Sequence, residues 1–287
     1  ITGGTGSFGS KFSEYILKNH KDIKKLVIFS RDELKQFHMS QKKIFLNNKK
    51  VRFFIGDIRD KDRLLRAFND IDIVVHAAAL KQVPAAEYNP TEFIKTNIIG
   101  SQNIVEACID RNVKKLIALS TDKAVAPANL YGATKLCGEK LFIAANNYAG
   151  RAKYKFSVVR YGNVISSRGS VIPKFLEINK DKTQKFFPVT DINMTRFLIS
   201  LEDGIKVVLF ALKNQVGGEI FVPKLPSVKI KDLCESINSK KKIKIVGVRP
   251  GEKIHEELIS SSESLNTYDI GKYYIVLPND NDSNKIK

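Results

Sequence analysis

The chain has 287 residues, of which 43% are hydrophobic and 27% charged, and its formal net charge at pH 7 is +18. That length can bury a large core in one domain or in two smaller ones, and the sequence has no apolar run of the roughly 18 residues that a membrane span needs. The cations come mostly from lysine runs such as KDIKK and SKKKIK, without the interleaved arginine and aromatic residues of nucleic-acid readers. We therefore expect no nucleic-acid partner and no membrane partner.

The spacing of cysteine and histidine disfavours a metal centre. Cys108, Cys137 and Cys234 form no CxxC pair, and the four histidines form no HxxH or HExxH set. Such spacing indicates buried, unpaired thiols, no metal ligands and a reducing, cytoplasmic location. The opening ITGG is typical of the end of a strand, so we expect the natural chain to begin upstream.

Residues 1–165 alternate short apolar runs with amphipathic stretches. The runs are rich in β-branched residues, which is typical of strands buried on both faces. This alternation predicts an α/β fold with a Rossmann-type, doubly wound parallel sheet. The predicted strands span residues 24–30, 51–57, 71–79, 113–120 and 155–163, and the clearest helices span 10–20, 61–69 and 91–111.

After residue 165 the pattern becomes irregular. We expect residues 166–275 to form mainly a smaller substrate-binding lobe, while a segment near 201–222 returns to the first domain. The polar end, residues 276–287, is typical of a flexible tail.

The first motif, TGGTGSFG, has glycines in a G-x-x-G-x-x-G register between a strand end and a helix. Such a turn lets the backbone approach a pyrophosphate, which then lies at the helix N-terminus. An ordinary strand–helix turn is the alternative, and the strands that follow favour a dinucleotide site. The candidate cofactor residues of this turn are Gly3, Thr5, Gly6, Ser7, Phe8 and Gly9.

The second predicted strand ends in FSRDELK, where Ser30 and Arg31 occupy the position that selects between cofactors. An acidic residue there prefers the ribose hydroxyls of NAD, whereas a basic residue accommodates the 2′-phosphate of NADP. With Lys35 one helical turn further, the sequence favours NADP. Asp32 opposes this interpretation unless it caps the next helix.

Two later strand ends add candidates for the same site. Asp57 and Ile58, in GDIRD, are placed to hold the adenine, and the small residues Ala77, Ala78 and Ala79 let the backbone lie beside the nicotinamide ribose. For each of these residues the alternative is a purely structural role, in the tight packing of strands on helices.

The stretch STDKAVAPANLYGATK carries the catalytic candidates. Tyr131 and Lys135 lie four residues apart, on one face of a predicted helix, so we expect the ammonium to lower the pKa of the phenol. A plain dehydrogenase needs no more than this pair and a cofactor. Asp122 and Lys123 therefore indicate a second chemical step.

TGGTGSFG, STDKA…YGATK and RPGEK together resemble the extended short-chain dehydrogenase/reductase superfamily, over nearly the whole chain. Within it, the sequence resembles the inverting UDP-N-acetylglucosamine 4,6-dehydratases of pseudaminic acid biosynthesis. The resemblance implies an NADP-dependent lyase that removes water from UDP-N-acetylglucosamine and inverts C5. Its product would be UDP-2-acetamido-2,6-dideoxy-β-L-arabino-hexos-4-ulose, made in the first step of pseudaminic acid synthesis for flagellin glycosylation.

The resemblance also implies a role for each catalytic candidate. Tyr131 would deprotonate the C4 hydroxyl, Lys135 would hold the cofactor ribose, and Thr121 would hydrogen-bond the reacting oxygen. Related hexose dehydratases carry Asp-Glu where this chain has Asp122 and Lys123. Asp122 would then be the acid at the C6 hydroxyl and Lys123 the base at C5, unless Lys123 is a surface lysine after a strand.

The substrate-binding candidates are polar residues after the predicted strand ends and in the irregular second half. Arginine suits bidentate phosphate recognition, and a carboxylate can accept ribose hydroxyls. Each of them could instead be a surface ion-pair partner. They are Lys81, Asn163, Arg168, Lys174, Arg196, Arg249 and Glu252.

Three other functions remain open at this point. A retaining UDP-N-acetylglucosamine 4,6-dehydratase is disfavoured because many carry Met in place of Tyr131. A nucleotide-sugar 4-epimerase has no need of Asp122 and Lys123. A non-catalytic NADP-binding regulator would tolerate loss of Tyr131 and Lys135, and both are present. The family forms closed assemblies, so we expect a homo-oligomer.

Overall fold

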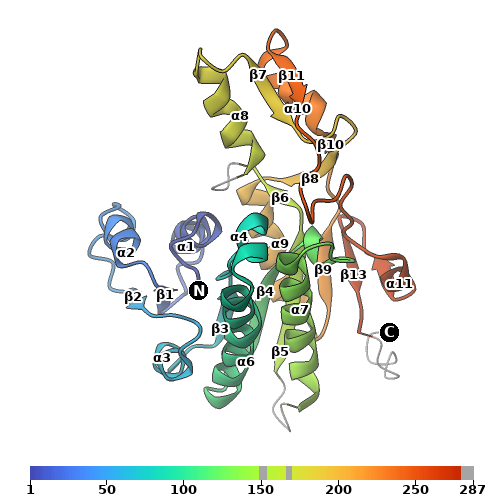
Figure 1. Cartoon of the computed structure of the whole chain (residues 1–287). Helices are drawn as coiled ribbons and strands as arrows, with labels where there is room; N and C mark the ends of the chain where they lie inside the picture. Colours follow the sequence, from blue (N-terminus) through green and yellow to red (C-terminus); the bar gives the residue numbers. More distant parts are fainter. Residues whose placement is uncertain (149–153, 166–169, 279–287) are drawn as a thin grey trace.

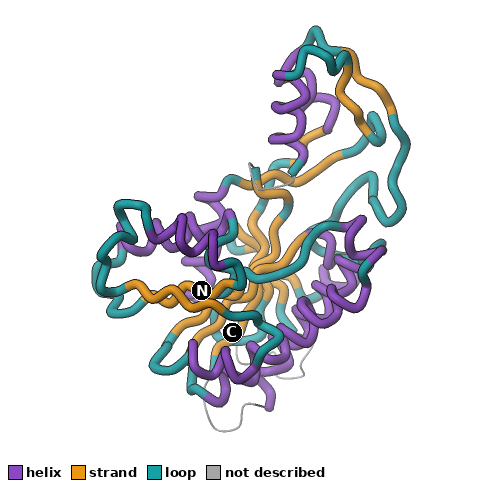
Figure 2. Tube along the Cα trace, turned by 60° about the vertical axis from the view of Figure 1, so that its left-hand side comes forward, coloured by secondary structure: helices purple, strands orange, loops and turns teal. Residues whose placement is uncertain are grey.

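The computed structural model describes residues 1–148, 154–165 and 170–278. Its main body has a central sheet between two layers of helices, and a smaller lobe extends from one edge (Figures 1 and 2). The predicted fold class, a Rossmann-type parallel sheet with a smaller C-terminal lobe, is confirmed.

The central sheet is built from eight strands and one bridging residue. Six strands follow the order β12-β13-β9-β5-β4-β3, and β1 pairs with β2. Thr2 joins the two groups, because its backbone bridges both Phe29 in β1 and His76 in β3. The strands are β1 (Leu26–Ser30), β2 (Val51–Ile55), β3 (Ile73–His76), β4 (Lys115–Thr121), β5 (Lys155–Tyr161), β9 (Ile220–Pro223), β12 (Thr267–Asp269) and β13 (Tyr273–Val276).

Successive apolar residues in the strands face opposite helical layers. Val74 and Val158 belong to one buried cluster, whereas Val75 and Val159 belong to the other. This two-sided burial explains why the strands are continuous apolar runs. The first layer holds α3 (Lys61–Ala67), α6 (Gly100–Asp110) and α7 (Leu130–Tyr148), and the second holds α1 (Ser7–Asn19) and α9 (Leu201–Asn214).

Several helices begin at polar caps that the sequence supplies. Asp32, Asp60 and Ser200 each accept a backbone N–H three residues further along the chain, which satisfies a donor that the helix leaves unpaired. The shorter helical segments of the main body are α2 (Glu33–Ser40), α4 (Val83–Tyr88), α5 (Pro90–Phe93), a π-helical turn at Ile94–Ile99 and a 3₁₀ turn at Asp122–Ala124.

The smaller lobe has its own buried cluster around Phe175, Phe187 and Cys234. Strand β8 pairs with β10 and with β6, and β7 pairs with β11. The elements beyond β5 that lie outside the central sheet and α9 are β6 (Asn163–Val164), α8 (Val171–Lys180), β7 (Phe186–Val189), β8 (Thr195–Ile199), β10 (Ser227–Lys229), α10 (Ile230–Asn238), β11 (Lys242–Ile245) and α11 (Ser261–Ser264).

The chain returns to the main body twice. Helix α9 lies within the predicted return segment, 201–222, and β9 extends one residue beyond it. Strands β12 and β13 then add an antiparallel edge to the central sheet, although residues 166–275 were expected to form mainly the lobe. The predicted tail, 276–287, starts at the last residue of β13, and residues 279–287 lie outside the described residues.

Two further expectations concern membranes and thiols. Among the helices of residues 1–148, 154–165 and 170–278, none is both long and apolar enough to cross a bilayer. The three cysteines are unpaired; Cys108 and Cys234 are buried, but Cys137 is exposed on α7. The expectation of buried thiols is therefore wrong for Cys137, whose position on the helix faces outward.

Candidate active site

The glycine turn lies at the carboxyl edge of the sheet, between Thr2 and helix α1. Gly3 has a φ of +64°, and a Cβ atom there would lie 2.8 Å from Ala77; a Cβ at Gly9 would lie 2.5 Å from the Gly3 carbonyl oxygen. Side chains at these positions would prevent the close approach of turn, helix and strand. Gly6 precedes α1 and offers no side-chain cap, so the first N–H groups of the helix can bind an anion.

A pocket opens beside this turn and collects residues from the ends of β1, β2 and β3. Ser7, Phe8 and Gly9 are not in its lining, because Ser7 and Gly9 build the helix start and Phe8 stacks on Phe12 with ring centroids 5.6 Å apart. The predicted residues that line it are Gly3, Thr5, Gly6, Ser30, Arg31, Lys35, Asp57, Ile58, Ala77, Ala78 and Ala79. Four more residues line it that were not assigned to the cofactor: Phe29, Asp32, Gly56 and Thr96.

The cations at the end of β1 are paired with carboxylates. Nη1 of Arg31 lies 3.4 Å from Oδ2 of Asp57, and Lys35 forms an ion pair with Asp32, which also caps α2 by accepting the Lys35 backbone N–H. Burial raises the pKa of Asp57, but hydrogen bonds from Arg59 and the charge of Arg31 outweigh it and hold that pKa below its usual range. The uncapped helix, the small residues and these charged groups fit a nicotinamide dinucleotide.

The catalytic candidates gather where β4 ends. The Thr121 hydroxyl donates to Oδ1 of Asp122 at 2.9 Å, and Nζ of Lys123 donates to the same oxygen at 3.0 Å. Lys123 also lies 3.5 Å from Oδ1 of Asn163 and 3.4 Å from Oε1 of Glu256. The Asp122 side chain is fully buried and that of Lys123 is 20% exposed, so Lys123 is not a surface lysine.

Helix α7 packs closely on this 3₁₀ turn because a glycine follows Tyr131. A Cβ atom at Gly132 would overlap the carbonyl oxygen of Lys123. The backbone N–H of Gly132 donates to Oδ1 of Asn129 at 2.8 Å, and the Asn129 amide donates to the Gly251 carbonyl at 2.7 Å. The motif YGATK thus places the helix, the turn and the C-terminal segment against one another.

Tyr131 and Lys135 are both buried, and their environment differs from the prediction. Burial raises the pKa of Tyr131, a hydrogen bond with Thr121 lowers it, and the charges of Asp122 and Glu256 raise it again. The expected lowering by Lys135 is therefore wrong for the protein alone, because Nζ of Lys135 donates to the carbonyl oxygen of Leu119 at 2.8 Å. Burial lowers the pKa of Lys135 itself to about 8, against the opposing charge of Glu139.

Lys81 belongs to the same electrostatic environment. Desolvation lowers its pKa first, and the ammonium of Lys123 lowers it further. Of the predicted substrate residues, Asn163 lies 3.5 Å from Nζ of Lys123, and Lys81 is close enough for the charge of Lys123 to act on it. Lys81 lies in the loop between β3 and α4, and Asn163 is the first residue of β6, just after β5.

The other substrate candidates are more dispersed. The guanidinium of Arg196 donates to the carbonyl oxygens of Thr195 and Ile254 at 2.7 and 3.0 Å, and it lies 3.3 Å from Oε1 of Glu252. Arg196 is only 6% exposed, which indicates that it and Glu252 hold the segment near Ile254 in place. Arg249 is exposed, and Arg168 lies outside the described residues. Lys174 is exposed and belongs to α8, a helix of the smaller lobe (Figure 1).

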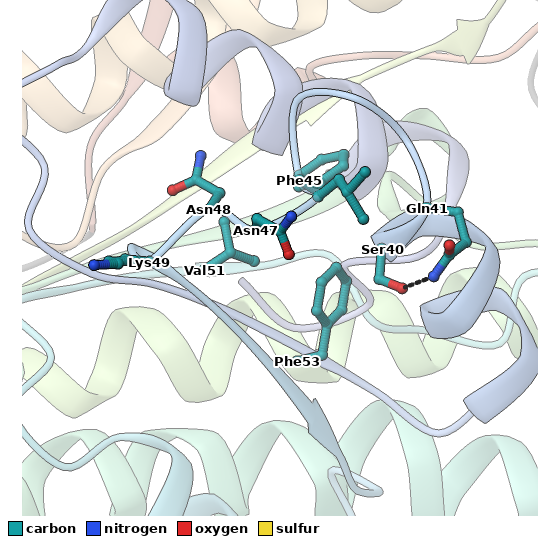
Figure 3. A pocket seen from close by; sticks show the side chains of 9 residues that line it. Ser40, Gln41, Phe45, Asn47, Asn48, Lys49, Val51 and Phe53 are labelled. Atoms are coloured by element: carbon teal, nitrogen blue, oxygen red, sulfur yellow. Dashed lines mark hydrogen bonds between the residues drawn. The ribbon is translucent and has the colours of Figure 1, made fainter.

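A second pocket lies away from these groups, where the chain after α2 enters β2 (Figure 3). Phe45, Val51 and Phe53 give it an apolar wall, and Gln41 and Asn48 add amide groups. No residue predicted for catalysis or binding lines it, so we assign it no part in the chemistry.

Glu256 is the functional candidate that sequence reasoning missed. It lies four residues beyond the Glu252 of RPGEK, in the stretch KIHEE, where nothing distinguishes it from the exposed Glu257. Within the described ranges, no group of three His, Cys, Asp or Glu side chains is placed to hold a metal ion. The site is therefore a cluster of lysine, carboxyl, tyrosine and threonine groups beside a dinucleotide pocket.

Comparison with known proteins agrees with this geometry. The chain is 55% identical over 278 residues to the UDP-N-acetylglucosamine 4,6-dehydratase (inverting) of Campylobacter jejuni, which covers 97% of this chain and 82% of the relative. It is 48% identical over 293 residues to a UDP-glucose 4-epimerase of Rickettsia bellii, covering 100% of this chain and 84% of that protein. The crystal structure of Pen from Bacillus thuringiensis superposes with a TM-score of 0.91 at 38% identity, covering 97% of this chain and 88% of Pen.

The fold and the Tyr131–Lys135 site define a short-chain dehydrogenase/reductase of the extended type, a class that uses a nicotinamide cofactor. The profile of the polysaccharide biosynthesis protein family matches residues 1–278. The chain therefore belongs to that family.

Proposed function

We propose that the chain is an NADP-dependent hydro-lyase that converts UDP-N-acetylglucosamine to UDP-2-acetamido-2,6-dideoxy-β-L-arabino-hexos-4-ulose. The observation that carries this proposal is the contact between Asp122 and Lys123 beside Thr121 and Tyr131. The high identity to the inverting dehydratase of Campylobacter jejuni supports it.

Each side chain of the cluster has a part in the proposed reaction. Tyr131 takes the proton of the C4 hydroxyl, and Thr121 hydrogen-bonds the same oxygen, while Lys135 holds the cofactor ribose. A nicotinamide cofactor held in the pocket beside the glycine turn would supply the hydride chemistry, which moves a hydride from C4 to C6 of the same sugar. Lys123 removes the C5 proton, which the new C4 ketone acidifies, and Asp122 protonates the departing C6 hydroxyl.

The 3.0 Å contact between Lys123 and Asp122 explains how this pair supplies both a base and an acid. The pair shares one proton. When Lys123 holds it, the pair is an ammonium and a carboxylate; when Asp122 holds it, the pair is an amine and a carboxylic acid. The second form is the active one for elimination.

The choice of NADP over NAD is supported by Arg31 and Lys35, which line the pocket at the end of β1. A 2′-phosphate placed there would pair with both cations. Asp32 is engaged with Lys35 as a helix cap and ion-pair partner. Extraction of the nucleotide bound to the purified protein, followed by mass analysis, tests this choice, and recovery of NAD alone would contradict it.

A 4-epimerase is the second candidate, because the Rickettsia bellii relative carries that name. Substrate with deuterium at C4 separates the two functions. A dehydratase releases water and places the label at C6, without added reductant, whereas an epimerase returns the label to C4. Identification of the product by NMR therefore tests the proposed function, and label at C4 would overturn it.

The position of the reaction in metabolism and the assembly state complete the proposal. We propose that the product enters pseudaminic acid synthesis for flagellin glycosylation in the cytoplasm, and that the protein is a homo-oligomer. Light scattering of the purified protein tests the second statement. Loss of flagellin glycan after deletion of the gene tests the first.

A further inference from the structure

Glu256 places a second buried carboxylate against Lys123. Its side chain is 3% exposed, and Oε1 lies 3.4 Å from Nζ of Lys123. The other oxygen, Oε2, is buried and has no hydrogen-bond partner among the described residues. Lys123 therefore lies between Asp122 and Glu256, although the elimination proposed above uses only one of these carboxylates.

Glu256 is held in this position by its own segment of chain. The ammonium of Lys253 donates to the carbonyl oxygen of Val125 at 2.8 Å, next to the active-site turn. The Thr195 hydroxyl bonds Nδ1 of His255 at 2.8 Å, and the Thr195 backbone N–H donates to the Ile254 carbonyl at 3.1 Å. These contacts fix the residues on the N-terminal side of Glu256 on both the main body and the lobe.

Inversion at C5 raises a problem that a single base does not solve. After elimination, the proton taken from C5 lies on Lys123, on the face of the sugar from which it came. If that proton returned to C5, the configuration would be retained. Inversion requires that the proton leave Lys123 before the opposite face of C5 is protonated.

We propose that Glu256 takes this proton from Lys123 and so commits the reaction to inversion, an inference that rests on the proposed dehydratase function. The N–H bond of the Lys123 ammonium breaks and an O–H bond forms at Oε1 of Glu256, which leaves a neutral amine that cannot protonate C5. Solvent water protonates the other face of C5. Glu256 acts through Lys123 and not on the sugar, so it is a positioning residue.

The proton balance closes at the end of the cycle. Asp122 has given its proton to the departing water, and Glu256 holds the proton that came from C5. That proton returns through Lys123 to Asp122, across the contacts of 3.4 and 3.0 Å. The proton that Tyr131 took from the C4 hydroxyl passes to solvent and replaces the one that water gave to C5.

Glu256→Gln tests the proposal, because the amide has nearly the same shape but cannot take the proton. Substrate with deuterium at C5 is turned over in ordinary water for short times, and the product is examined by NMR for label and configuration at C5. The wild type should lose the label and invert. A positioned proton-transfer group contributes a factor of about 100 or more, so we expect product with retained label and retained configuration to increase at least about tenfold.

Glu257→Gln is the matched control, because Glu257 is the next residue and is exposed; it should behave as the wild type does. If Glu256→Gln still inverts C5 with complete loss of label, the proposal is wrong and Glu256 only holds Lys123. If Glu256→Gln instead stops oxidation at C4, Glu256 acts on Tyr131 and the proposal is also wrong.

Should Glu256→Gln fail to fold, Glu256→Asp keeps a carboxylate but moves it away from Nζ. Partial retention of the C5 label in that variant supports the proposal, and unchanged stereochemistry overturns it. A wild-type protein that releases no water, or that does not invert C5, would refute the proposed function itself. That result is distinguishable from a failure confined to the Glu256 variants.

Discussion

Replacement of Lys123 should affect both chemistry and stability, because this lysine separates two buried carboxylates. Lys123→Met removes the ammonium that is bonded to Asp122 and that, among the described residues, is the one ion-pair partner of Glu256. Removing one partner of a buried ion pair typically destabilises a protein by about 3–5 kcal/mol. We expect Lys123→Met to lose stability in this range at pH 7, and dehydration to fall by about a hundredfold or more.

Lys123→Gln separates the two effects. The amide can donate a hydrogen bond to one of the carboxylates but cannot act as a base, so this variant should recover part of the stability and none of the dehydration. Urea unfolding measures the first, and a single turnover assayed for 4-keto sugar and for released water measures the second. Oxidation at C4 should persist, because Tyr131 and Lys135 remain. Lys140→Met, at an exposed lysine on α7, controls for the loss of a surface cation.

Two results would refute this reasoning. If Lys123→Met were as stable as the wild type at pH 7, the two carboxylates would not both be charged beside Lys123. If either variant released water at nearly the wild-type rate, Lys123 would not be the base.

Three other outcomes follow from the structure. Arg31→Ala should weaken NADP binding roughly fivefold more than NAD binding, since the side chain is half exposed; calorimetric titration of both nucleotides checks this, and equal weakening would contradict it. Arg160→Met should destabilise the protein by about 3–5 kcal/mol in urea, because it leaves the buried Glu139 and also Glu263 without their guanidinium. Burial, and then the charge of Lys135, lowers the pKa of His76 to about 3. The stability contributed by the buried neutral imidazole is therefore fully present above pH 6.5 and is lost as the pH falls towards 3. By pH 5 that loss is about 2 kcal/mol, and His76→Asn should remove it from the difference between urea unfolding at pH 8 and pH 5; an unchanged difference would show that His76 is charged when buried.

Most of the fold was predictable because its signals are local. The apolar runs of β1, β3, β4 and β5 are largely buried on both faces, so their composition alone distinguishes them from the helices between them. The expectation of burial on both faces is wrong for β2, which pairs with β1 alone among the described strands and leaves Arg52 and Ile55 exposed. The antiparallel edge formed by β12 and β13 was not predicted. Its strands are short, partly exposed and joined by a tight turn with Gly271 at a φ of +89°, and β12 (TYD) has no apolar run to mark it.

The same contrast holds for the site. Thr121, Asp122, Lys123 and Tyr131 lie in one short stretch, and a motif was enough to bring them together. Glu256 reaches Lys123 only through tertiary contacts, which no spacing in the sequence encodes. The predicted phosphate-binding role of Arg196 depended on residue type alone, whereas its buried hydrogen bonds to Thr195 and Ile254 depend on how the lobe folds.

The contacts of residues 251–256 with the active-site turn have a consequence for how such enzymes diverge. In the proposed reaction the nucleotide half contributes Tyr131 and Lys135, which serve the oxidation, whereas the C-terminal segment contributes Glu256, which faces Lys123. In a chimaera of two relatives that both carry Lys123 and Tyr131, the proposed role of Glu256 predicts that the stereochemical outcome is inherited with the C-terminal half. In such a chimaera the contacts of Asn129 with Gly251 and of Val125 with Lys253 must be preserved, because these hydrogen bonds join the two halves beside Lys123.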